Sequence, residues 1–200
     1  MSGDEPDWTR FWEGKRAFRS FLFYRIYERF RARSYFSLLK NMNLKDKRIL
    51  ELGGGSGYIC KLICEKFDCK GTVVDNNEKA YEIFKRVIGN ERVNYILEDM
   101  FKHEKRGYDL VFSDGLIEHF HLGKREDIIS LHRKFAKKGG FVMFFVPKKS
   151  WLVERFMSME EGYEEKMDSK QLIEETSIPG LKLVSTNKDF HMIGVLYKAE

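Results

Sequence analysis

The residues best suited to chemistry begin with one glycine-rich stretch. It reads Glu51-Leu52-Gly53-Gly54-Gly55-Ser56-Gly57. Glycines let a backbone adopt positive φ and approach a ligand closely, and a helix that begins after such a loop offers unpaired N–H groups to a polar ligand. The dinucleotide pattern G-x-G-x-x-G would need glycine at position 58, where this chain has Tyr58. The stretch therefore predicts a ligand-binding turn and disfavours a nicotinamide dinucleotide, with a tight turn that binds nothing as the alternative.

Further polar side chains follow three apolar segments downstream of this loop. Asp75 lies about 20 residues after the loop, a separation at which an acid accepts hydrogen bonds from both hydroxyls of a ribose. Asp99 precedes Met100, and the segment Tyr108-Asp109-Leu110-Val111-Phe112 runs into Ser113-Asp114-Gly115-Leu116-Ile117-Glu118-His119. A turn acid at Asp75 and a strand-end cap at Asp99 are the structural alternatives.

Alternating strands and helices must position these groups. The apolar segments predict strands at 48–52, 71–74, 93–97, 108–112, 141–146, 181–186 and 192–198. Helical patterns lie between them at 57–67, 78–88, 126–136 and 170–176, and Lys137-Lys138-Gly139-Gly140 suits a helix C-terminus. This alternation is typical of an α/β fold with a parallel sheet.

The order of these motifs resembles the class I S-adenosylmethionine-dependent methyltransferases, and their small-molecule members above all. The likeness rests on E-x-G-x-G-x-G, on the acids at the next two strand ends, on the D-L-V…L-E-H-like stretch, and on Ala136-Lys137-Lys138-Gly139-Gly140 before the fifth strand. It covers residues 45–147 well. It implies a Rossmann-like, doubly wound three-layer sandwich whose seven-stranded sheet is mostly parallel, with the last strand antiparallel.

The resemblance also implies a cofactor and its site. The cofactor is S-adenosyl-L-methionine, and no metal is implied. In this family the acid at the position of Asp99 meets the adenine amino group, and the residue after it packs on the ring. The implied cofactor-binding residues are Glu51, Gly53, Gly54, Gly55, Gly57, Asp75, Asn76, Asp99, Met100, Ser113 and Asp114.

Methyl transfer from a sulfonium needs an aligned nucleophile, and it needs a base only if the nucleophile must lose a proton. His119 is the candidate base because its unperturbed pKa lies near neutrality. The alternative is a histidine that packs beside the cofactor and moves no proton. His121 and His191 are weaker candidates.

Residues 1–44 predict a helical cap ahead of a methyltransferase domain at 45–200. Cations and aromatic rings alternate from Arg10 to Arg33, which suits RNA binding, a membrane-surface helix or, as the favoured interpretation, a lid over the active site. Trp8, Trp12 and Tyr24 are then candidate contacts. Residues 148–168 form a second possible lid.

Composition narrows the function further. A chain of 200 residues with 42% apolar residues suits one domain, and its net charge of +5 permits an anionic partner without requiring one. The acidic N-terminus and the short apolar runs predict a cytoplasmic protein without a membrane span, and the three cysteines predict packing thiols. The preferred acceptor is a small molecule; an RNA acceptor and a non-catalytic cofactor-binding module are the alternatives.

Overall fold

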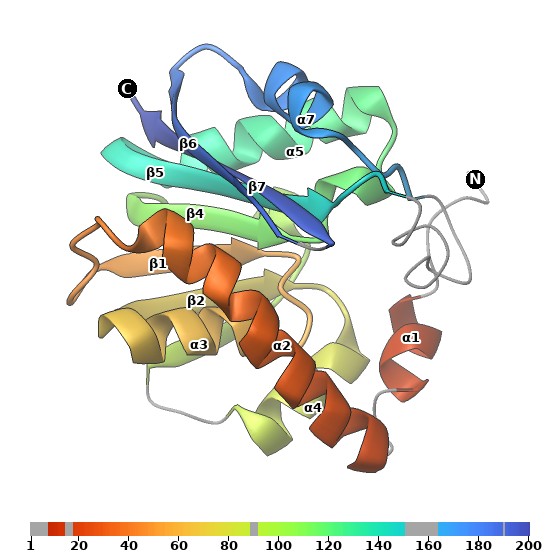
Figure 1. Ribbon diagram of the computed structural model, residues 1–200. Helices are drawn as coiled ribbons and strands as arrows, with labels where there is room; N and C mark the ends of the chain where they lie inside the picture. The colour runs from red at the N-terminus through yellow and green to blue at the C-terminus, as the bar shows by residue number, and fades with distance from the viewer. Residues whose placement is uncertain (1–7, 15–17, 89–91, 151–163, 190) are drawn as a thin grey trace.

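One seven-stranded sheet organises the computed structural model of the chain, which describes residues 8–14, 18–88, 92–150, 164–189 and 191–200. The strands occur in the order β3-β2-β1-β4-β5-β7-β6 (Figure 1). All neighbouring pairs are parallel up to β5, whereas β7 is antiparallel to both β5 and β6. The strands are β1 Arg48–Leu52, β2 Lys70–Asp75, β3 Val93–Leu97, β4 Tyr108–Asp114, β5 Ala136–Pro147, β6 Leu181–Lys188 and β7 Met192–Ala199. The predicted fold class, including its antiparallel last strand, is confirmed.

Helices cover both faces of this sheet (Figure 1). On one face, α2 (Phe18–Leu39), α3 (Tyr58–Phe67) and α4 (Glu78–Val87) share a core with β1 and β2. On the other face, α5 (Leu122–Phe135) and α7 (Ser169–Thr176) pack on β4, β5 and β7. The central strands are buried on both sides, which explains why β5 reads as an almost continuous apolar run after Gly140.

Local chemistry fixes where the helices nearest the cavity begin. Gly57 caps α3 with φ of 70°, a left-handed conformation that costs glycine little. Asn77 caps α4, and its side chain accepts hydrogen bonds from the backbone N–H groups of Lys79 and Ala80. Because β1 and β2 are parallel neighbours, both helix starts lie at the same edge of the sheet.

The structure differs from the predicted boundaries at several places: for example, α5 begins at Leu122 and not at residue 126, and β5 begins at Ala136 and not at residue 141. The N-terminal helical segment consists of two helices, α1 (Trp8–Gly14) and α2. The predicted helix C-terminus at residues 137–140 is wrong: α5 ends at Phe135, and Ala136 already pairs with Tyr108 as part of β5. Lys137 forms an ion pair with Asp109 on β4, so this cation serves strand pairing and not the end of the helix.

The membrane-span prediction can be checked on the helices. Within the described ranges, none of them combines the length and the apolarity needed to cross a bilayer.

Candidate functional site

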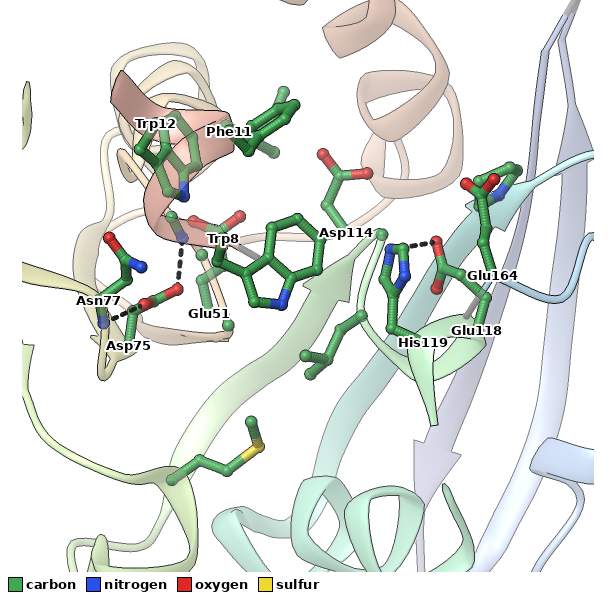
Figure 2. A pocket seen from close by; sticks show the side chains of 18 of the residues that line it. Trp8, Phe11, Trp12, Glu51, Asp75, Asn77, Asp114, Glu118, His119 and Glu164 are labelled. Carbon is green, nitrogen blue, oxygen red and sulfur yellow. Dashed lines mark hydrogen bonds and ion pairs between the residues drawn. The ribbon is translucent and has the colours of Figure 1, made fainter. Parts of the chain in front are cut away.

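A cavity of about 550 Å³ lies where β1, β2 and β4 end. This volume falls within the range of small-molecule and cofactor pockets. Most of the predicted cofactor-binding residues line it: Glu51, Gly53, Gly54, Gly55, Asp75, Asn76, Asp99, Met100 and Asp114. Three elements that the sequence separates widely therefore converge on one space, and Figure 2 shows their side chains around it.

Two predicted residues, Gly57 and Ser113, do not line the cavity. A Cβ at Gly57 would come within 3.0 Å of Val73 and 3.2 Å of Phe84, so this glycine allows the loop to pack on its neighbours. Ser113 is buried in β4, and its hydroxyl has no hydrogen-bond partner in the described part of the chain. Their positions give Gly57 a structural use and leave the predicted binding role of Ser113 without a contact to support it.

The glycine loop is shaped by close contacts on its cavity side. Gly53 and Gly55 have φ of 61° and 53°, which L side chains rarely adopt. A Cβ at Gly53 would lie 2.6 Å from a methyl carbon of Leu116, and a Cβ at Gly55 would overlap the indole of Trp12. The loop must therefore be glycine at both positions, because Leu116 packs against one of them and Trp12 of α1 against the other.

Asp75 joins the loop to the second helix start. One carboxylate oxygen accepts the Gly55 N–H at 2.8 Å, and the other accepts the Asn77 N–H at 2.8 Å (Figure 2). Burial raises the pKa of Asp75, and these two backbone hydrogen bonds oppose that rise. A carboxylate has about four lone-pair sites, so two remain for a ligand.

Asp99 and Met100 lie at another part of the cavity wall. Met100 begins the short helix η1 (Met100–Lys102), and Asp99 caps it by accepting the Phe101 N–H at 3.0 Å. The structure thus realises the strand-end cap that the sequence left open, and the same carboxylate also faces the cavity. Phe101, which the sequence did not single out, lines the cavity beside Met100.

A largely buried ion-pair network connects α2 to β4, and sequence reasoning missed it. Arg31 of α2 donates to Glu28 at 2.9 Å, to Tyr35 at 3.2 Å and to Asp114. Although burial opposes its charge, the carboxylates of Asp114 and Glu28 hold the pKa of Arg31 above its ordinary value. Spacing i to i+3 on a helix indicates the Glu28 pair, but the partner on β4 depends on tertiary packing.

His119 and Glu118 lie on the short helix η2 (Ile117–His119) after β4. Trp8 of α1 packs edge-on against the His119 ring, with the ring centroids 4.8 Å apart. The Nε2 atom of His119 lies 4.0 Å from a Glu118 carboxylate oxygen. Figure 2 shows these groups on the opposite side of Trp8 from Asp75 and Asn77. The cavity therefore has two ends with different chemistry, and the base role of His119 stays a prediction.

Of the other two candidate histidines, one lines the cavity and one does not. His191 lines the cavity, where burial lowers its pKa although Asp189 partly opposes that shift. His121 is exposed at the start of α5 and does not line it. The cysteines Cys60, Cys64 and Cys69 are all buried in the core, away from this cavity.

The predicted lids are described only in part. Trp8, Phe11 and Trp12 of α1 line the cavity, whereas the side chain of Tyr24 lies outside the described residues. Of the predicted lid at 148–168, residues 151–163 also lie outside them, and Glu164 lines the cavity.

Comparison with known proteins gives this site a context. A protein family described as "Methyltransferase domain" matches residues 25–180, most of the chain. Residues of this chain are 35% identical over 74 positions to a malonyl-[acyl-carrier protein] O-methyltransferase of Priestia megaterium. That match covers 36% of this chain and 27% of the relative, so the chain matches about a quarter of that protein's length.

Solved structures share the fold at low sequence identity. The DhpI–SAH complex has a TM-score of 0.74 and 17% identity, covering 96% of this chain and 94% of that one. Magnesium protoporphyrin IX methyltransferase of Synechocystis PCC 6803, with bound SAH, has a TM-score of 0.66 and 13% identity, covering 84% and 82%. With the family match and the strand order, these likenesses lead to one conclusion: the chain belongs to the methyltransferase domain family, among the class I S-adenosylmethionine-dependent methyltransferases.

Proposed function

We propose that this chain transfers the methyl group of S-adenosylmethionine to a small-molecule acceptor. The observation that carries the proposal is the two-ended cavity, in which the glycine loop and Asp75 lie at one end and His119 at the other. When bound, S-adenosylmethionine supplies an activated methyl group on a sulfonium, so the protein has to align the acceptor and exclude water.

The residues at the first end fit an adenosyl compound. Asp75 keeps two lone-pair sites for ribose hydroxyls, and the glycine loop presents backbone close to the cavity. Met100 and Phe101 offer apolar surface for a flat base, next to the carboxylate of Asp99. Glu51 is buried beside the loop, where burial and the nearby Asp114 raise its pKa well above the usual range. A cationic ammonium group would stabilise its charged form.

The second end suits an acceptor of modest size. Trp8 and Phe11 of α1 cover the cavity from one side, and residues from η2 and β7 line it from the other. A covered cavity of about 550 Å³ holds a small molecule beside a cofactor and excludes water from the reacting atoms. We propose that α1 acts as the cap of this cavity. His119 lies where it could accept a proton from the acceptor.

RNA is a weaker acceptor candidate. Arg31, one of the cations that made the N-terminal segment resemble an RNA-binding face, has a side chain only 12% exposed and is bound to Glu28 and Asp114. A cation engaged in this way does not contact phosphate. Arg29 and Arg33 are exposed on α2, but their surface lies outside the cavity.

The test is methyl transfer from radiolabelled S-adenosylmethionine, with the product separated by size. One sample contains a small-molecule extract, another contains total RNA, and a third contains neither. We expect label only in the small-molecule fraction, together with release of S-adenosylhomocysteine. Label in RNA would show that the acceptor is RNA and not a small molecule. Cofactor binding without any methyl transfer would favour a non-catalytic module.

A further inference from the structure

One buried acid in the cavity has no hydrogen-bond partner among the described residues; the nearest charged contact, the Nε2 atom of His119, lies 4.0 Å from it. Glu118 is fully buried, and neither of its carboxylate oxygens makes a hydrogen bond to any described residue. An unpartnered buried carboxylate is costly, and native proteins satisfy nearly all such groups. Glu118 is among the residues that line the cavity, so a molecule bound there is the candidate partner for this carboxyl.

The neighbours of Glu118 are already engaged. Arg125, whose charge lowers the pKa of Glu118, is held by Glu165 at 2.8 Å and Glu175 at 2.6 Å. Arg125 also donates to the backbone oxygens of Ile117 and Phe120. Arg125 therefore links η2, α5 and α7 through its hydrogen bonds, and it does not neutralise Glu118 by direct contact.

Acids predominate around this carboxyl. Burial raises the pKa of Glu118 well above its usual range, and its own backbone N–H lowers it. Asp114 and Glu164, which line the same cavity, raise it further, and Arg125 lowers it by a smaller amount. Asp114 is paired with Arg31, and Glu164 lies 3.8 Å from Lys166. An acceptor with a carboxylate or phosphate at this end would add a further negative charge beside these three acids.

Aromatic rings complete the surroundings. Trp8 packs against His119 next to Glu118, and Tyr27 and Phe120 line the same cavity. Rings attract a cation over their faces, and the attraction grows when water is excluded.

We propose that Glu118 is the acceptor-recognition residue of this cavity and that the acceptor is an amine held by its carboxylate. The inference rests on the proposed function and specifies its substrate class. An ammonium or amine N–H supplies the hydrogen bond that the carboxyl lacks, and a positive charge there favours its ionised form. Alcohols and acids lack the positive charge that this end of the cavity favours.

The test measures binding to protein that is saturated with S-adenosylhomocysteine. The probes are a panel of arylalkylamines, each matched with the alcohol and the carboxylic acid of the same shape, titrated by ligand-observed NMR. The variant is Glu118→Gln, which keeps the shape of the side chain and removes its charge. The control is Glu126→Gln on the exposed side of α5, outside the cavity.

We expect amines to bind wild type and Glu126→Gln at least about tenfold more tightly than their alcohols and acids. Glu118→Gln should lose that preference while binding S-adenosylhomocysteine within twofold of wild type. Equal binding of all three probe classes, absence of amine binding, or an unchanged preference in Glu118→Gln would overturn the inference and leave the proposed function standing.

Two further outcomes are decisive. If Glu118→Gln does not fold, the comparison of amines with alcohols and acids on wild type alone decides the matter. If wild type fails to bind S-adenosylhomocysteine at all, the proposed function fails and the inference fails with it.

Discussion

Replacing Gly55 with alanine tests the contact between the N-terminal helix and the glycine loop. Gly55 has φ of 53°, and a Cβ there would overlap the Trp12 ring. Gly107 provides a matched control, because its φ is 81° and a Cβ there would meet nothing within 4 Å. The two substitutions share the backbone penalty and differ in the contact with α1.

The magnitudes follow from these geometries. A left-handed alanine costs about 1–2 kcal/mol, so Gly107→Ala should lower the free energy of unfolding by that amount. Trp12 is only 8% exposed, and losing a buried tryptophan costs about 3–5 kcal/mol. Because the ring can shift without leaving entirely, Gly55→Ala should exceed the control by about 2–4 kcal/mol.

Urea unfolding of four proteins measures this difference. They are the two glycine variants and the same variants made on a Trp12→Ala background. With the indole gone, the gap between Gly55→Ala and Gly107→Ala should shrink to within about 0.5 kcal/mol. A gap that is absent in the first pair, or that persists without Trp12, would show that α1 does not lie on the glycine loop.

Three other substitutions probe the cavity and the core. Asp75→Asn should weaken S-adenosylhomocysteine binding by about 1–3 kcal/mol in calorimetry, because a charged hydrogen-bond acceptor is lost; unchanged affinity would contradict the ribose assignment. If His119 is a base, His119→Gln should slow turnover about 100-fold or more with little change in cofactor affinity. The same pH–rate profile in the variant and in wild type would contradict that role. His132 is buried with its pKa lowered from 6.5 to about 4, so only the unfolded chain gains a proton between those values. Stability should therefore fall by up to about 3 kcal/mol as the pH drops from 7 to 4, and by less in His132→Leu; parallel pH curves would refute this.

The parts of the fold that sequence predicts are those with local causes. The parallel strands are predicted from apolar segments, because strands buried on both faces need apolar side chains throughout. The turn after β1 is predicted from its glycines, and at Gly53 and Gly55 the structure has no room for a larger side chain. Asp75 is found by its distance from the loop, because the two strand ends are neighbours in the sheet.

The parts that sequence misses depend on residues brought together by packing. Arg31 reads as one more cation in a basic helix, yet its partner Asp114 is 83 positions away. The sequence places Lys137 at a helix C-terminus, whereas in the structure it lies in β5 and forms an ion pair with Asp109 of β4. Nothing in the sequence around Glu118 shows that its carboxylate makes no hydrogen bond to the described residues, because Arg125 is engaged by Glu165 and Glu175, which lie 40 and 50 positions away from it.

A crystal structure with S-adenosylhomocysteine would show directly whether the cofactor occupies this cavity. We expect ribose hydroxyls within hydrogen-bond distance of Asp75, the adenine ring against Met100, and the sulfur facing the end of the cavity that holds His119. A ligand bound elsewhere, or one lying in the cavity with Asp75 bonded only to Gly55 and Asn77, would contradict this expectation.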